Sequence, residues 1–545
     1  MTSSTRTARA VIVAGAALAA CPADSGDSTA GTTDWALPDL VVDGSTDAGA
    51  PTPEDGTTSG AADEQPLTRV ERILAALDVA MYACPERSWP DVATNYRQRQ
   101  VLLGSRAEDR AWLWNHQSGG GASPAVMETQ LSALSPEWGA YFNVGVLEKV
   151  KTLGISLDDT QEYNDSVIAS GATPWPDYAI SLAFHEGFHF LSDQDDWNDG
   201  DGSRSAAYPE PWEPRYLRAQ LKGALLAEIQ QPGQGMAAAA HWQTRLVVEH
   251  AAEMKAIRSY DCTEGSAEYV SLMMSAIAEL GCDAPDEALL KLASSHLNGQ
   301  FLSEGYYDGG LEPYELGVLA GLLLRREGVA GWELAVENGQ APADQLLAAV
   351  APVAQPDDPA VQNAAQAAVA VRNEAVGAEI EPMLARMKDP AYTRVAVSFA
   401  WIAGSFGVGG FYYLADDPAV PEVMLRFSAV LATPSQVSIA VNDQTVLAGV
   451  KTPCALPQGY VIAVTVPTAA LTHIGGAATS SDSQVKFADL AVEPTMDMHN
   501  LPWLCPVDAG GANGAPAPQP GLGLHTLRRR DGEPTRVLVR PDRKG

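Results

Sequence analysis

Apolar residues recur at helical spacing through most of the region from residue 68 to residue 389. Thr68 and Glu71 form a capping box, and the apolar residues that follow it are three and four positions apart: Val70, Ile73, Leu74, Leu77 and Met81. Similar patterns predict further helices over residues 176–191, 216–230, 241–260, 263–281, 311–326 and 360–388. Thr263 is expected to cap the helix that ends at Gly281. The pattern predicts a mainly helical domain over 68–389.

The pattern changes after about residue 389. Short stretches that alternate or run apolar lie between turns rich in Gly, Pro, Asn and Asp: 395–399, 423–427, 437–441, 460–464 and 485–487. Runs of this length and spacing are typical of β-strands. The predicted fold class is therefore α+β, with a mainly helical core followed by a β-rich C-terminal module over 390–506.

Both ends of the chain have a different composition. Residues 1–20 have a positive start, an apolar stretch and small residues, which is typical of a signal peptide. Leu18-Ala19-Ala20-Cys21 resembles the bacterial lipobox, in which the cysteine is lipidated. Residues 21–67 hold ten Asp and Glu and no Lys or Arg, which predicts an acidic disordered tether. Residues 507–545 are rich in Gly and Pro and then turn basic, which predicts a disordered tail.

The net charge limits the partners. The chain has 35 Lys and Arg against 68 Asp and Glu, a formal charge of −33, which argues against nucleic-acid binding. No run of 18 apolar residues occurs, so membrane attachment is expected only through a lipid on Cys21. Pro22, and not Asp, follows this cysteine, so by analogy with bacterial lipoprotein sorting we expect an exported lipoprotein of the cell envelope or surface, with the outer membrane favoured.

Six cysteines occur in the sequence, and lipidation of Cys21 would leave five. Export permits disulfides, and the pairs Cys262–Cys282 and Cys454–Cys505 are the first to consider, although spacing does not fix the connectivity. No CxxC motif occurs, which argues against a zinc site built from cysteines.

The sharpest motif is His185-Glu186-Gly187-Phe188-His189, an HExxH on a predicted helix. Residues i and i+4 share one helical face, so both imidazoles can reach one ion, and Glu186 can serve as general base for a water that the ion acidifies. With 9 His and 31 Glu in 545 residues, about 0.01 such motifs are expected by chance. The motif therefore predicts a zinc site.

A catalytic zinc needs a third protein ligand. The stretch Thr263-Glu264-Gly265-Ser266-Ala267-Glu268-Tyr269, together with HExxH, resembles the gluzincin metallopeptidases of the thermolysin and aminopeptidase type. The resemblance covers about residues 174–281. It implies that His185, His189 and Glu264 bind zinc, that Glu186 is the catalytic base, and that the Glu268 carboxylate accepts a hydrogen bond from a zinc-bound imidazole and so orients it.

Asp195 is the competing third ligand. Its spacing after the HExxH is similar to that of metzincin-like enzymes, but Ser192 stands where their glycine turns the chain. Glu264 is favoured because only that alternative supplies a second helix and an orienting partner.

The resemblance implies a lipid-anchored zinc metallopeptidase with a zincin-like core, which would hydrolyse peptide bonds in a peptide or protein substrate. The alternative is a surface lipoprotein that keeps the zinc-binding domain for ligand or partner binding. Glu186 favours catalysis, because a site that only binds has no need of a base.

Overall fold

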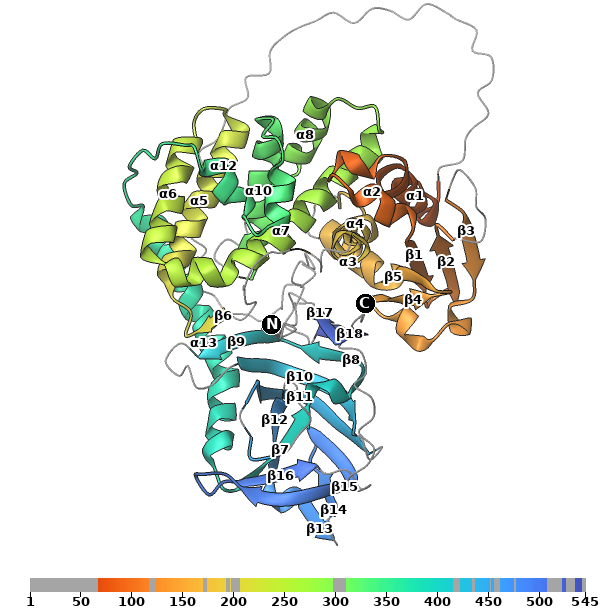
Figure 1. Ribbon diagram of the computed structural model, residues 1–545, viewed down its shortest axis with the longest axis vertical. Helices are drawn as coiled ribbons and strands as arrows, with labels where there is room; N and C mark the ends of the chain where they lie inside the picture. Colours follow the sequence, from red (N-terminus) through yellow and green to blue (C-terminus); the bar gives the residue numbers. More distant parts are fainter. Residues whose placement is uncertain are drawn as a thin grey trace, which may run out of the picture.

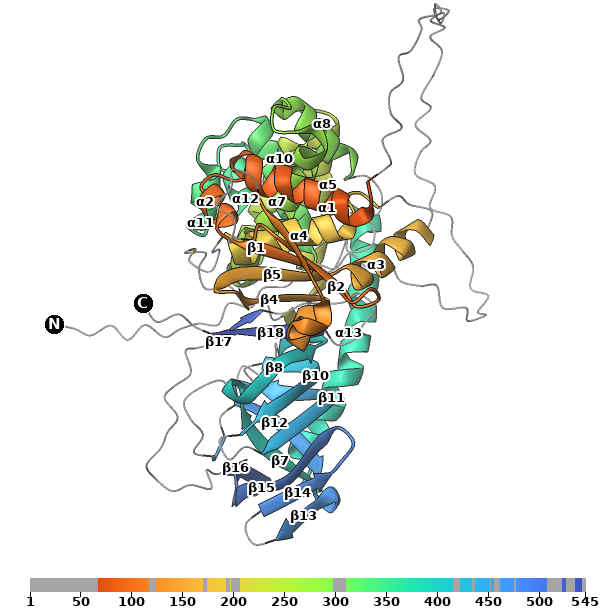
Figure 2. The ribbon, with the colours of Figure 1, turned by 90° about the vertical axis from the view of Figure 1, so that its right-hand side faces the viewer.

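The computed structural model describes residues 67–116, 124–169, 174–192, 197, 206–297, 310–414, 422–433, 437–450, 452–454, 461–474, 477–506, 522–525 and 535–541. Helices and a small mixed sheet form the upper part of the molecule in Figure 1, and a β-rich module forms the lower part. The long helix α13 (Pro359–Lys388) runs from one part down along the other, as Figure 2 shows. Both helices and sheets are present, as an α+β fold requires.

Helices supply most of the upper part. Their bounds are α1 (Arg69–Leu77), α2 (Val92–Arg97), α3 (Leu157–Ala169), α4 (Tyr178–Leu191), α5 (Trp212–Gln230), α6 (Met236–Glu249), α7 (Ala251–Leu280), α8 (Asp286–Ser295), α10 (Glu312–Arg326), α11 (Trp332–Glu337) and α12 (Pro342–Leu347). The capping box predicted at Thr68 and Glu71 is confirmed at the start of α1. Among the described residues, no helix is both long and apolar enough to cross a membrane.

A sheet lies inside the region that the sequence predicted to be mainly helical. Its strands are β1 (Gln100–Ser105), β2 (Arg110–Trp114), β3 (Val126–Thr129), β4 (Phe142–Leu147) and β5 (Val150–Ser156), in the order β3-β2-β1-β5-β4. Strands β1 and β5 are parallel, and the other neighbours are antiparallel. The strands escaped prediction because apolar runs of four to seven residues fit either a strand or a buried helical turn.

The two faces of this sheet pack differently. One face contributes to the main core with α1, α4 and α7. The other face covers a small core around Trp138, where a Cβ on Gly154 would lie 2.9 Å from the indole ring. Glycine at this position therefore lets the Trp138 ring pack directly against strand β5.

The β-rich module predicted over 390–506 is present. Its strands are β7 (Tyr392–Ser398), β8 (Ile402–Val408), β9 (Gly410–Leu414), β10 (Glu422–Ala432), β11 (Ser438–Ala448), β12 (Val461–Pro467), β13 (Leu471–Ile474), β14 (Ala477–Ser481), β15 (Val485–Met496) and β16 (Pro502–Pro506). Strand β11 pairs with β10, β12 and also β15, so the sheet folds over an apolar interior. The short strand β6 (Ala206–Tyr208) joins it through β9.

Two strands lie in the stretch expected to be a disordered basic tail. Strand β17 (Leu522–His525) pairs with β18 (Thr535–Pro541), and β18 pairs with β8. The apolar run Val537-Leu538-Val539 gives β18 strand character between its arginines. A composition rich in Gly, Pro and Arg predicts disorder because it averages over this short run.

Helix α13 is fixed to the module along its length and at its end. Val376, Ile380 and Met383 of α13 belong to an apolar cluster with residues of β7, β9 and β10. The buried guanidinium of Arg394 donates hydrogen bonds to the carbonyl oxygens of Met387 and Asp389, which lie at the carboxyl end of the helix. These contacts satisfy backbone acceptors that the helix itself leaves open.

The cysteines pair differently from the first expectation. The described residues form the disulfides Cys84–Cys282 and Cys454–Cys505. The Cys454–Cys505 pair is confirmed, and the Cys262–Cys282 pair is wrong. Cys262 lies on α7 and Cys282 lies just beyond the end of that helix, so the two cannot meet.

Helices α7 and α10 cross with their backbones in contact. A Cβ on Gly317 would lie 2.1 Å from the Cα of Gly265, and a Cβ on Gly265 would lie 2.8 Å from the carbonyl oxygen of Pro313. No larger residue fits at either position without moving a helix, because the opposing atoms belong to the backbone.

We predict that Gly317→Val lowers the free energy of unfolding by about 3 kcal/mol, at the upper end of the cost of overpacking. Ala364→Val, at an exposed position of α13, is the control and should cost about 0.5 kcal/mol through helix propensity alone. Urea unfolding followed by helical ellipticity measures both changes. Equal midpoints for the two variants would contradict the close crossing.

Candidate metal centre

Helix α4 presents both histidines of the HExxH motif. Its N-cap residue Asp177 accepts a hydrogen bond from the amide of Ala179 (3.0 Å) and pairs with Arg69 of α1 (2.8 Å). His185 and His189 lie one turn apart on the same face, and their Nε2 atoms are 3.1 Å apart. Both side chains are buried.

Glu264 of α7 completes a three-residue group. Its Oε2 atom lies 3.2 Å from Nε2 of His189 and 3.4 Å from Nε2 of His185. The carboxylate is fully buried. Within the described part of the chain, these three side chains form a group whose donor atoms lie close enough together to hold one metal ion.

The three donor atoms fit a tetrahedral ion. Ligands about 2.1 Å from zinc lie about 3.4 Å from one another in a tetrahedron. The separations of 3.1, 3.2 and 3.4 Å therefore leave a point about 2 Å from all three atoms. A donor set of two imidazole nitrogens and one carboxylate oxygen, with a fourth position open, is also the composition of catalytic zinc sites.

Glu268 lies behind the group, one turn after Glu264 on the same face of α7. Its Oε2 atom is 2.9 Å from Nδ1 of His185. An ionised carboxylate can only accept a hydrogen bond, so Nδ1 of His185 carries the proton. The Nε2 atom of the same ring faces His189 and Glu264, the other two candidate metal ligands. Glu268 thus fixes the ring in the tautomer that a metal ligand needs.

The pKa of His185 shows that the group attracts positive charge. Burial by itself lowers this pKa, but hydrogen bonds with Glu264 and Glu268, together with the charges of Glu268 and Glu186, raise it to about 10. A proton therefore supplies, in the protein without metal, the positive charge that a metal ion would otherwise bring.

Glu186 is fully buried on α4 beside His185 in sequence. Its carboxylate also lies close enough to Tyr178 to act on it: burial is the main cause of the raised pKa of this phenol, and the negative charge of Glu186 adds to it. The charge of Glu186 also helps to raise the pKa of His185, so Glu186 lies near the three donors without being one of them.

Tyr314 is a neighbour of the site that the sequence did not reveal. Its ring stacks on the imidazole of His185, with centroids 5.7 Å apart and planes 21° from parallel. Tyr314 lies on α10, and no motif links this helix to the HExxH segment. Tyr314 lies close to Gly317, where α10 crosses α7.

Other predictions for the site have different outcomes. Thr263 does not cap a helix: it lies in the middle of α7, where its hydroxyl donates to the carbonyl oxygen of Ser259 (2.9 Å). Glu264 accordingly reaches the two histidines from the middle of a 30-residue helix and not from the first turn of a helix. Asp195 and Cys21 lie outside the described residues.

No family model, curated protein or solved structure matches this chain.

We predict that Glu264→Ala weakens zinc binding by about tenfold or more, because it removes one of three donors. Asp195→Ala should bind zinc as the wild type does. Competition against a chromophoric chelator measures both affinities. A loss of zinc affinity in Asp195→Ala but not in Glu264→Ala would favour the metzincin-like arrangement.

A second prediction concerns protons. At pH 8 the imidazolium of His185 must lose its proton before Nε2 can bind a metal, so zinc binding should release about one proton per chain. The affinity should then rise about tenfold per pH unit below the pKa of His185, and level off above it. Titration calorimetry in buffers of different ionisation enthalpy counts the protons. No release at pH 8 would show that His185 is already neutral.

Proposed function

We propose that this chain is a zinc-dependent metallopeptidase of gluzincin type, with a zincin-like core, that hydrolyses peptide bonds in a peptide or protein substrate. The observation that carries the proposal is the meeting of His185, His189 and Glu264 with Glu268 behind the first histidine. Two helices far apart in the sequence supply these four side chains. A fortuitous cluster has no need of a carboxylate that orients one of its imidazoles.

The residues of the chain divide the chemistry among them. The two histidines and Glu264 would hold zinc, which would act as a Lewis acid on the substrate carbonyl and on a water. Glu186 would take a proton from an attacking water as general base and would then pass a proton to the leaving amine as general acid.

The same proposal includes the location of the enzyme. The signal-like residues 1–20 and the lipobox around Cys21 support an exported, lipid-anchored protein. The acidic residues 22–67 would then separate the catalytic part from the membrane surface. Its membrane contact would come from the lipid, and nucleic acid is not an expected partner.

The test of catalysis is Glu186→Gln. This variant should lose at least about 1000-fold in cleavage of labelled, unfolded casein, because the amide cannot take a proton, while it keeps about one zinc per chain. Elemental analysis of the same samples gives the metal content.

Two controls make the result decisive. His189→Ala should lose both zinc and activity, and Glu249→Gln, at the end of α6 and outside the metal site, should lose neither. Wild-type protein that binds zinc but cleaves no more casein than Glu186→Gln would favour the binding-protein alternative. Loss of zinc from Glu186→Gln would contradict the role of Glu186 as base.

A further inference from the structure

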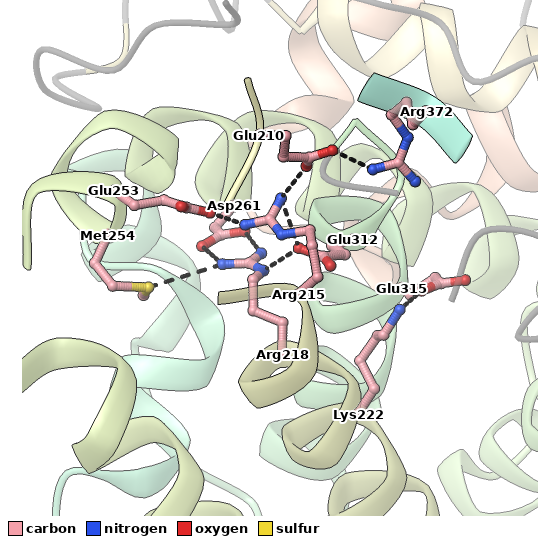
Figure 3. Close-up of polar contacts among 10 residues, drawn as sticks. All are labelled: Glu210, Arg215, Arg218, Lys222, Glu253, Met254, Asp261, Glu312, Glu315 and Arg372. Atoms are coloured by element: carbon pink, nitrogen blue, oxygen red, sulfur yellow. Dashed lines mark hydrogen bonds and ion pairs between the residues drawn. The ribbon is translucent and has the colours of Figure 1, made fainter. Parts of the chain in front are cut away.

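A stripe of three buried cations follows one face of α5. Arg215, Arg218 and Lys222 are spaced at i, i+3 and i+7, and all three side chains are almost completely buried (Figure 3). Burial of three positive charges on one helix requires matching negative charges from its neighbours.

The matching carboxylates come mainly from α7 and α10. Arg218 holds Asp261 of α7 with both terminal nitrogens, one of them at 3.1 Å, and its Nε lies 2.8 Å from Oε2 of Glu312 on α10. Arg215 also reaches Glu312 (3.3 Å), and Lys222 pairs with Glu315 of α10. The outer end of this network continues through Glu210, Glu253 and Arg372 (Figure 3).

The network adjoins the metal site at two points. Asp261 lies one turn before Glu264 on α7, so a shift of one carboxylate along the helix moves the other. Glu312 and Glu315 lie before and after Tyr314 in the sequence of α10, and the ring of Tyr314 stacks on His185. Arg218 joins these two points, because a single guanidinium binds both Asp261 and Glu312.

Without α5, this part of the protein would bury negative charge in excess. Helix α7 brings Asp261, Glu264 and Glu268 to one region, and α10 adds Glu312 and Glu315. These carboxylates lie where α7 and α10 touch at Gly265 and Gly317. Mutual repulsion would move the helices apart, and Glu264 is the side chain whose position such a movement would change most directly.

We propose that Arg218 is a positioning residue for the metal centre: its ion pairs with Asp261 and Glu312 fix α7 against α10, so that Glu264 meets the two histidines. This inference rests on the proposed zinc site. It adds a residue that determines the position of Glu264 without touching the metal or the substrate. Arg215 and Lys222 support it by neutralising the remaining carboxylates of the same face.

The experiment compares Arg218→Met with Arg326→Met in the full-length protein. Arg326 and Glu228 also join α10 to α5 (2.7 Å), but at the opposite end of both helices, about 20 Å along the axis from Glu312. Both substitutions remove an ion pair between the same two helices. We expect Arg218→Met to weaken zinc binding by about 10- to 100-fold, and Arg326→Met to change it by less than about twofold, even where both lower the unfolding temperature.

Two further measurements separate positioning from simple loss of stability. In Co²⁺-loaded protein, Arg218→Met should change the visible absorption bands, which report the ligand geometry, while Arg326→Met should leave them unchanged. In a double-mutant cycle, Arg218→Met should cost little further affinity once Glu264→Ala is present, because both changes remove the same ligand. Arg218→Lys, which keeps the charge, should recover part of the affinity.

The outcomes distinguish the inference from the function on which it rests. Wild-type protein that binds no stoichiometric zinc would overturn the proposed function itself. Zinc binding by wild type and by Arg218→Met with equal affinity would overturn only the positioning role. Full additivity with Glu264→Ala would also overturn it, because Arg218 would then act through another part of the site.

Discussion

The close crossing of α7 and α10 is the constraint on which the rest of the site depends. Gly265 and Gly317 let the two backbones touch, and a single added carbon at either glycine would meet backbone atoms. Glu264 directly precedes Gly265, so the contact that brings the helices together also sets the depth at which the carboxylate reaches the histidines. Tyr314, three residues before Gly317, is brought against His185 by the same crossing. Helix packing at one point therefore determines the position of a candidate metal ligand, Glu264, and of the tyrosine ring that stacks on His185.

This packing has an electrostatic consequence. Helices that meet so closely cannot admit water between them, so the carboxylates on their facing sides must be neutralised by protein groups or by an ion. The cations of α5 neutralise Asp261, Glu312 and Glu315. Glu264 has two imidazoles as its neighbours, and without metal the proton on His185 supplies the positive charge there. A divalent cation would satisfy the same requirement more completely, since it binds all three donors at once.

The sequence predicted the parts of this site that are local, and it failed where contacts between distant segments decide. The capping box at Thr68 and the helical face shared by His185 and His189 depend on residues three and four apart, and both are found in the structure. Thr263 looked like a helix start because a hydroxyl before an acidic turn is typical of one, yet the apolar contacts of α7 carry the helix through it. The strands β1–β5 were missed for the same reason, because short apolar runs become strands only when partners pair with them. Arg218 and Tyr314 had no signal at all, since neither belongs to a motif and their contacts follow from which helices cross.

The long helix α7 is held at several points along its length, and this explains how it can place one carboxylate accurately. A helix of 30 residues spans about 45 Å, and over that length small bends would displace a side chain at its centre. Arg218 holds Asp261, Gly317 meets Gly265, and just past the end of the helix Cys282 is bonded to Cys84, which lies between α1 and α2. The first two points lie within one turn on either side of Glu264, and the disulfide limits motion at the far end. The third donor of the candidate metal centre is therefore set by the packing around α7 and not by the short motif in which it occurs.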